Sequence, residues 1–358
     1  MSEVSSDSLT QLKVLNHDPL VAGVPIAALG GQVTPSQQFF IRNHFPIPRL
    51  DTTSWTLQVD GEVERVLHLT YDDLKSMASQ EQAVTLECAG NSRATVQPPI
   101  EGLLWDHGGV STGRWTGVSL GAVLGRAGLR YTAKVVLFEG ADRGTEEGAT
   151  GQLNYAMSLP LEKALDPGTL LAYEMNGETL SPEHGYPVRL VVPGWYGMTS
   201  VKWLVNIRVL DREFEGFHQD DYYVFVDEGD EDGSPKQRVT SMRVKSLITW
   251  PGRGEILEVG SHDLRGLAWS GEGPVSLVEV SVDDGRTWQS AEVEGSESAY
   301  AWQQWRFQWE AIRPGYFLLR ARATDSKGNV QPMQAKWNFR GFANNSIHAV
   351  PVAVRSRP

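Results

Sequence analysis

Residues 86–93 read LECAGNSR, and they contain Cys88, the one cysteine among 358 residues. An apolar run ends at this residue and is followed by Ala-Gly-Asn. One cysteine cannot form an internal disulfide, so Cys88 is either an inert buried thiol or a thiol used for chemistry. Ala89 and Gly90 are small enough to admit a bulky group beside the thiol, and Arg93 can face an anion.

Two more polar segments of the first half interrupt apolar sequence. They are FFIRNHFPIP at residues 39–48 and EHGYPVRLVVPGWYGMTSVKWL at residues 183–204. Their polar side chains include Arg42, Asn43, His44, His184, Arg189, Ser200 and Lys202. Backbone amides of such loops, together with Arg and Lys, suit an anionic phosphate group. The spacings of the usual nucleotide-binding loops are absent from the sequence.

Composition excludes several classes of partner. The net charge is −12 and the pI is near 5.2, which argues against nucleic acid and anionic membranes, because both require a basic face. No apolar run reaches the roughly 20 residues of a membrane helix. The first residues, MSEVSSDSLTQLKVLNHDP, lack the basic and apolar parts of a signal peptide. We therefore expect a cytoplasmic protein.

Local patterns in the first half predict strands mixed with short helices. Trp55, Leu57 and Val59 alternate as in a strand, and a turn signal follows at residues 60–61. Thr70 precedes an acidic first turn and predicts a capped helix. Residues 118–129 predict a second helix that begins near Ser119. Residues 1–36 are polar and rich in proline, which predicts an arm and not a domain.

The second half predicts strands alone. DEGDEDGSPKQR (residues 227–238) is typical of a linker, and Asp284-Gly285 follows an alternating segment as in a hairpin. The alternation of Trp305, Phe307 and Trp309 is that of a packed core. These short strands predict an immunoglobulin-like β-sandwich. The chain therefore divides into an arm (residues 1–36), an α+β domain (residues 37–235) and the sandwich (residues 236–358).

Taken in order, the polar segments resemble those of the sulfite oxidase family of molybdenum enzymes. The matching segments are RNHFPIP (42–48), CAGN (88–91), GLLWDHGGVSTGRWTGVSL (102–120), FEGADRG (138–144), HGYPVRLVVPGWYG (184–197), SVKWL (200–204) and WNFRG (337–341). The resemblance implies a mixed α/β domain that binds molybdopterin, followed by a β-sandwich that forms a homodimer.

The resemblance also implies a molybdenum–molybdopterin cofactor. Cys88 would bind the metal as a thiolate, and a soft thiolate suits a sulfur-rich metal site. The residues implied to hold the rest of the cofactor are Phe40, Ile41, Arg42, Asn43, His44, Asp142, His184, Arg189, Ser200, Val201 and Lys202.

A small oxyanion is the substrate that the resemblance implies. The residues around it would be Arg42, Arg93, Trp105, Arg340 and a tyrosine. Counting without gaps from the SVKWL segment selects Tyr223, which we prefer, whereas matching an Asp-Tyr pair selects Tyr222. Three arginines would converge on the anion, where their fixed charge and bidentate geometry are useful.

The implied reaction is the oxidation of sulfite to sulfate by oxygen-atom transfer. Two electrons would leave to an external acceptor, a cytochrome or oxygen, and an acidic surface would favour a basic cytochrome. No haem is expected, because the 38 residues before Phe39 are too few for a haem domain.

Departures from the family pattern leave the oxyanion open. Ser92 stands where animal members have a second arginine, and Ile347-His348-Ala349 stands where they have Trp-His-Arg. A related molybdenum enzyme that reduces nitrate or another oxo compound stays an alternative, although plant-type nitrate reductases have asparagine at the tyrosine position. A non-enzymatic binding module built on the sandwich is the second alternative.

Overall fold

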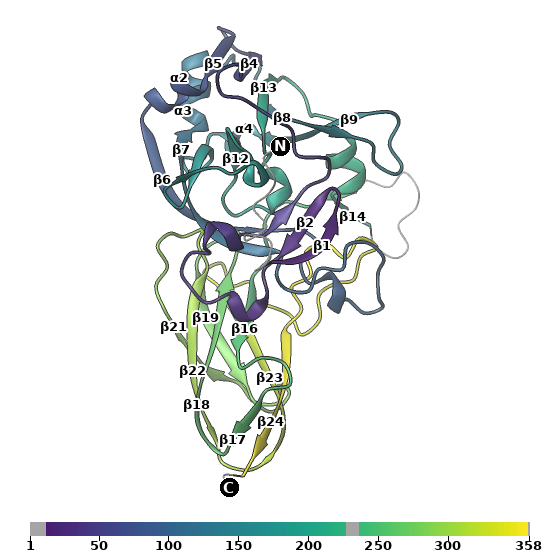
Figure 1. Ribbon diagram of the computed structural model, residues 1–358, viewed down its shortest axis with the longest axis vertical. Helices are drawn as coiled ribbons and strands as arrows, with labels where there is room; N and C mark the ends of the chain where they lie inside the picture. The colour runs from purple at the N-terminus through teal and green to yellow at the C-terminus, as the bar shows by residue number, and fades with distance from the viewer. Residues whose placement is uncertain (1–11, 227–235, 357–358) are drawn as a thin grey trace.

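A computed structural model describes residues 12–226 and 236–356 of the chain. Figure 1 shows an upper lobe of mixed strands and helices above a long lower lobe of strands. Most of the predicted linker, residues 227–235, lies outside the described residues. Its end differs from the prediction, because β15 (Gln237–Arg238) pairs with β14 (Val224–Phe225). The Arg238 side chain, on β15, donates to Glu213 and Asp220, which precede β14 in the chain.

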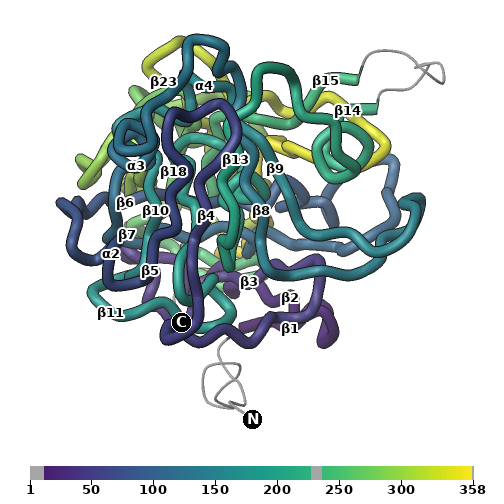
Figure 2. Tube along the Cα trace, turned by 90° about the horizontal axis from the view of Figure 1, so that it is seen from above, coloured from purple at the N-terminus to yellow at the C-terminus, as the bar shows by residue number. Residues whose placement is uncertain are grey.

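Two sheets form most of the upper lobe. The first sheet has the strand order β11-β10-β7-β6, and β12 also pairs with β10. Its strands are β11 (Glu178–Thr179), β10 (Leu170–Met175), β7 (Val110–Ser119), β6 (Ser79–Glu87) and β12 (Arg189–Val191). The second sheet has the strand order β5-β4-β13-β8-β9. Its strands are β5 (Leu67–Thr70), β4 (Thr56–Gly61), β13 (Leu204–Leu210), β8 (Val135–Gly144) and β9 (Leu153–Pro160). Figure 2 shows β4, β13, β8 and β9 side by side.

Short helices close the ends of these strands. α2 (Tyr71–Ser76) begins with a capping box between Thr70 and Asp73, which confirms the predicted helix. α3 (Leu120–Ala127) follows Ser119 and buries an apolar face. It is shorter than predicted, because residues 118 and 119 pair with β10 as part of β7. The remaining helical turns are α4 (Leu161–Ala164), η1 (Ile26–Ala28), η2 (Ser36–Gln38), η3 (Arg93–Thr95), η4 (Pro182–His184), η5 (Gly197–Thr199) and η6 (Phe217–Tyr222).

The N-terminal arm is ordered where the structure describes it. β1 (Lys13–His17) pairs with β2 (Leu20–Gly23), and β2 pairs with β3 (Ile41–Arg42). Because β3 contains Arg42, the arm packs directly against the segment that carries the RNHFPIP motif. Directly after β2, the amide of Val24 donates to the carbonyl of Gly108 in the loop before β7.

The lower lobe is the predicted β-sandwich. Its first sheet has the order β16-β18-β22-β21 and its second the order β17-β24-β23-β19-β20. The strands are β16 (Lys245–Trp250), β17 (Ile256–Glu258), β18 (Gly260–Trp269), β19 (Val275–Ser281), β20 (Gln289–Ser290), β21 (Glu292–Val293), β22 (Gln303–Ala311), β23 (Gly315–Asp325) and β24 (His348–Arg355). Asp284 and Gly285 both have positive φ angles between β19 and β20, which confirms the predicted hairpin.

Buried apolar side chains join the two lobes. Trp305 and Trp309 fill the interior of the sandwich, as their alternation predicted. A second cluster runs from the upper lobe into the near end of the sandwich, where it includes Trp269 and Trp302. The upper lobe therefore rests on the sandwich through shared apolar contacts. Within the described residues, no helix combines the length and apolarity needed to cross a membrane.

Candidate active site

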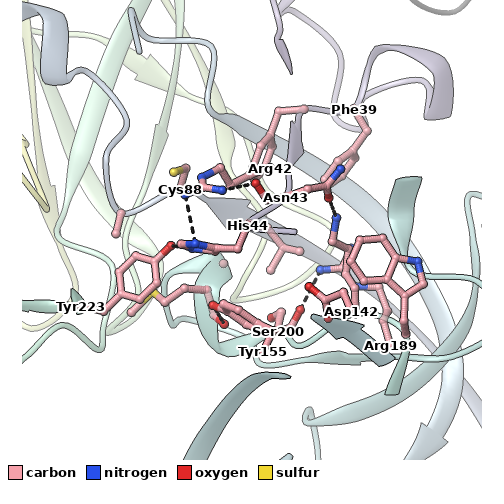
Figure 3. Close-up of a pocket in the computed structure, with 17 residues that line it drawn as sticks. Phe39, Arg42, Asn43, His44, Cys88, Asp142, Tyr155, Arg189, Ser200 and Tyr223 are labelled. Atoms are coloured by element: carbon pink, nitrogen blue, oxygen red, sulfur yellow. Dashed lines mark hydrogen bonds between the residues drawn. The ribbon is translucent and has the colours of Figure 1, made fainter. Parts of the chain in front are cut away.

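A pocket in the upper lobe gathers many of the predicted site residues (Figure 3). Its empty space, which includes open solvent, measures about 670 Å³. The predicted residues that line it are Phe40, Arg42, Asn43, His44, Cys88, Asp142, Arg189, Ser200, Lys202 and Tyr223. Figure 3 shows Cys88 and Tyr223 on one side of the pocket, with Arg189 and Asp142 on the other.

Other predicted residues stand behind or beside these walls and do not line the pocket. They are Ile41, Arg93, Trp105, His184, Val201, Tyr222 and Arg340. Trp105 is buried and packs edge-on against Phe40, at 6.1 Å between ring centroids. The guanidinium of Arg340 lies 4.8 Å above the ring of Tyr222. Of the two candidate tyrosines, Tyr223 is therefore the one in the pocket wall.

Cys88 follows directly after β6, and the long pairing of β6 with β7 sets its position. The amide of Cys88 donates to the carbonyl of Gly109, at 2.8 Å, just before β7 begins. The side chain is buried in the pocket wall. Burial raises the pKa of the Cys88 thiol, and the nearby charges of Arg42 and Arg93 oppose this rise. A metal bound here would displace the thiol proton.

The sequence predicted that Gly90 makes room for a bulky group beside the thiol. In the structure, the space beside Gly90 is occupied by the side chain of Arg93. A Cβ atom at Gly90 would lie 2.8 Å from Nη2 of Arg93. The Arg93 guanidinium donates to the carbonyls of Arg340, at 2.9 Å, and Leu103, at 3.1 Å. Arg93 thus ties the Cys88 loop to the WNFRG segment through its hydrogen bonds to the backbone.

A buried polar network beneath Cys88 escaped the sequence analysis. Glu87 accepts hydrogen bonds from Lys245 of the sandwich, from Trp269 and from Asn91, each at 2.9 Å. Lys245 also donates to the hydroxyl of Ser92 at 2.9 Å. The one available signal was a charged residue at position 87 inside an apolar run.

Ser92 connects this network to His107. The Ser92 hydroxyl lies 2.8 Å from Nδ1 of His107, and the ring of His348 lies 4.4 Å from that imidazole. Asp106 and His107 are adjacent, and in an extended chain their side chains would point to opposite faces. The structure nevertheless brings Asp106 to 3.7 Å from Nε2 of His107, because the chain bends at His107.

Cations gather at the end of the pocket opposite Cys88. The Arg189 guanidinium donates to the carbonyls of His184 and Ser200, both at 3.1 Å. The Lys202 ammonium donates to the side-chain oxygen of Asn43 and to a backbone carbonyl. Burial lowers the pKa of Arg189 to about 9 and that of Lys202 well below its usual range. Such desolvated cations are expensive without an anion, so this end of the pocket fits a phosphate.

Polar atoms near these cations also await a partner. Within the described residues, Nδ2 of Asn43 and Oδ1 of Asp142 are buried without a hydrogen bond. Burial raises the pKa of Asp142 to about 6, although the Lys202 charge opposes it. Near neutral pH, a carboxyl group of this kind can either donate or accept a hydrogen bond. It therefore suits a bound ring system that carries both N–H groups and hydrogen-bond acceptors. The donor set therefore fits an anionic, polar cofactor.

Family comparisons agree with this geometry. Residues 44–218 match the family described as "Oxidoreductase molybdopterin binding domain", and residues 236–355 match the "Mo-co oxidoreductase dimerisation domain". Sulfite oxidase of Gallus gallus is 37% identical over 94% of this chain and 77% of its own length. The chain belongs to the sulfite oxidase family. Mitochondrial sulfite oxidase of Macaca fascicularis is 40% identical over 96% of this chain, and the chain spans 66% of that relative's length.

Two further relatives of this sulfite oxidase family member have other names. The sulfane dehydrogenase SoxCD of Paracoccus pantotrophus superposes with a TM-score of 0.82 at 29% identity, covering 98% of this chain and 90% of that one. A nitrate reductase of Phaseolus vulgaris is 36% identical over 94% of this chain and 42% of its own length. The predicted family and fold are thus confirmed. The domain boundaries, the roles of the site residues, the absence of haem and the cytoplasmic location stay predictions.

Proposed function

We propose that this protein is a molybdenum oxidoreductase that oxidises sulfite to sulfate. The pocket supports the proposal, because it places a single thiol at one end and buried cations at the other. Sulfite oxidases among the relatives, and a sulfane dehydrogenase of the same fold, favour a sulfur compound as substrate.

The chain would hold the cofactor at both ends. Cys88 would bind molybdenum, and Arg189 and Lys202 would bind the phosphate through charge-assisted hydrogen bonds. The unpartnered atoms of Asn43 and Asp142 would bind the pterin. When bound, the cofactor supplies the oxygen transfer and the two-electron oxidation, which side chains cannot perform.

Arg42 and Tyr223 would meet the substrate at the Cys88 end. Arg42 lines the pocket and directs one guanidinium nitrogen toward the carbonyl of Asn43, and the rest of the group stays available for an oxyanion. Burial raises the pKa of the Tyr223 phenol far above neutrality, so it stays protonated at working pH. The Arg42 charge would counter the repulsion that a chain of net charge −12 exerts on an anionic substrate.

The remaining parts of the proposal concern partners. The dimerisation domain supports a homodimer, and the electrons would pass to an external acceptor, a cytochrome or oxygen. An acidic chain would attract a basic cytochrome, so its rate of reduction should fall as salt is added. A rate that is flat with salt would argue against that acceptor.

Nitrate reduction is the second candidate, because a plant nitrate reductase matches nearly the whole chain. The deciding experiment measures sulfite oxidation and nitrate reduction on one purified sample, each expressed per molybdenum. The proposal predicts sulfite oxidation far in excess of nitrate reduction. The reverse ratio would replace it with the reductase, and a protein isolated from a competent host without molybdenum would favour a binding module.

A further inference from the structure

A chain of hydrogen bonds leaves the pocket at Tyr223. The Tyr223 hydroxyl lies 2.7 Å from Nε2 of His44, and Nδ1 of His44 lies 2.5 Å from Oε1 of Glu146. Glu146 belongs to the segment between β8 and β9, and its side chain is 19% exposed, whereas that of His44 is 5% exposed. Glu146 therefore stands between a buried imidazole and solvent, outside the set of pocket residues.

The charges of these groups determine where the protons lie. Burial would raise the pKa of Glu146, but the nearby imidazole of His218, at 3.6 Å, and the hydrogen bond with His44 outweigh it and keep the pKa low. Burial, assisted by the Arg42 charge, lowers the pKa of His44 to about 3. At neutral pH Glu146 is thus an anion and His44 a neutral imidazole, which has one N–H group.

One tautomer of His44 satisfies this arrangement. A carboxylate can only accept, so Nδ1 of His44 must carry the proton and donate it to Glu146. Nε2 is then an acceptor, and the Tyr223 hydroxyl must donate to it. Nη2 of Arg42 also lies 3.5 Å from Nδ1, but this distance is at the outer limit of a hydrogen bond, and the contact with Glu146 is much shorter.

The consequence reaches the pocket. A phenol hydroxyl can donate one hydrogen bond, and Tyr223 donates it to Nε2 of His44. The oxygen of Tyr223 therefore presents only lone pairs, which accept hydrogen bonds, to the pocket. We propose that Glu146 is a positioning residue that, through His44, holds the Tyr223 hydroxyl as a hydrogen-bond acceptor toward the substrate. This inference rests on the proposed function.

Such an acceptor distinguishes substrate from product. Hydrogensulfite, or a water molecule, has a proton to donate to Tyr223. Sulfate at neutral pH has none, so its oxygens meet the lone pairs of Tyr223 and the product is bound less tightly. Glu146 would thus favour release of the product without touching it.

Other groups around His44 do not offer a competing partner for its ring nitrogens. From η6, His218 packs edge-on at 4.8 Å between centroids, and Tyr222 at 5.3 Å. From β9, Tyr155 stacks on His44 at 5.1 Å. His218 lies 3.6 Å from Oε1 of Glu146 and supports its negative charge. His44, Glu146 and His218 also have the geometry of a candidate metal site, which the experiment must separate from the tautomer.

The test uses the holoenzyme labelled with ¹⁵N in histidine. In the wild type the shifts of His44 should report a proton on Nδ1 at neutral pH. Glu146→Ala removes the acceptor and should shift the population toward the Nε2–H tautomer. Glu146→Gln keeps a carbonyl oxygen for Nδ1–H and should restore the wild-type pattern. Glu147→Ala, an exposed neighbour with the same loss of charge, is the matched control.

Product inhibition supplies the second readout. With Tyr223 free to donate to an anion, Glu146→Ala should bind sulfate about tenfold more tightly, as expected for one gained hydrogen bond to a charge. Glu146→Gln and Glu147→Ala should keep the wild-type inhibition constant. An Nε2–H tautomer in the wild type, unchanged sulfate inhibition in Glu146→Ala, or a stoichiometric second metal lost with Glu146 would each overturn the inference. The tautomer is measured without turnover, so failure to oxidise sulfite would refute the proposed function separately.

Discussion

The Lys245 ammonium lies 2.9 Å from the Glu87 carboxylate, and both side chains are only 2% exposed. Lys245 comes from the first strand of the sandwich, and Glu87 ends the strand that leads into Cys88. Hydrogen bonds from Trp269 and Asn91 complete the coordination of the carboxylate. The sandwich therefore fixes the thiol loop of the upper lobe through a buried ion pair.

Removing one partner of this pair should be costly. Lys245→Met leaves Glu87 buried without its counter-charge, and we expect the free energy of unfolding to fall by about 3–5 kcal/mol. Chemical denaturation measures this change. Lys245→Met combined with Glu87→Gln should recover much of the loss, because no charge is then stranded. Arg306→Met, in an exposed pair with Glu294, should cost about 0–1 kcal/mol. Equal losses in the buried and exposed pairs would contradict the account.

Arg189 should matter to the cofactor more than to the fold. In Arg189→Met, removal of a desolvated charge offsets the loss of its hydrogen bonds, so the unfolding free energy of the cofactor-free protein should change by less than about 2 kcal/mol. The cofactor loses a phosphate ligand, and molybdenum per chain should drop sharply in elemental analysis. Arg126→Met on exposed helix surface is the control. If Arg189→Met retained the molybdenum content of the wild type, Arg189 would not be a cofactor ligand.

Stability should depend on pH through His348. Burial, with the Lys245 and Arg253 charges, lowers the pKa of His348 from 6.5 to about 4. Between these values the unfolded chain takes up a proton that the folded chain does not, so stability is lost as pH falls, by about 3 kcal/mol at pH 4. His348→Gln should reduce the dependence of the denaturation midpoint on pH over this window without abolishing it, because burial also lowers the pKa values of His44 and His184, to about 3. His17→Gln, at an exposed position, should leave the slope of the wild type. Identical slopes in all three proteins would refute the assignment.

Gly90 provides a steric test of the Arg93 contact. The added Cβ of Gly90→Ala would press on a guanidinium that two carbonyls hold, and we expect about 1–3 kcal/mol of destabilisation. Gly125→Ala is the matched control, because open space surrounds that helical glycine. It should stabilise the protein by about 0.5–1 kcal/mol. Thermal unfolding measures the stability of both variants. A Gly90→Ala protein as stable as the wild type would mean that the Arg93 side chain moves aside without cost.

Much of the fold was predictable because its signals are local. The capping box at Thr70 and the positive φ angles at Asp284 and Gly285 depend on neighbours in sequence, and the structure has both features. The residues that line the pocket also come largely from contiguous motifs. Motif membership did not show which side chains face inward, and Trp105 and Arg340 lie outside the lining.

Contacts between distant segments were not predictable in the same way. Lys245 and Glu87 are 158 positions apart, and no polar motif marks Lys245 as the partner of Glu87. Glu146 contacts His44 across 102 positions, from a polar segment that reads as an ordinary loop. Such pairs become visible only when the sheets bring the segments together.

The most direct test of the central claim compares wild type with Cys88→Ser. Both proteins are purified from a host that makes the cofactor, and sulfite oxidation is measured per bound pterin. We predict about one molybdenum per chain and ready oxidation of sulfite in the wild type. Cys88→Ser should retain the pterin through the cation end of the pocket and lose sulfite oxidation. A Cys88→Ser protein that oxidises sulfite as fast as the wild type would contradict the account.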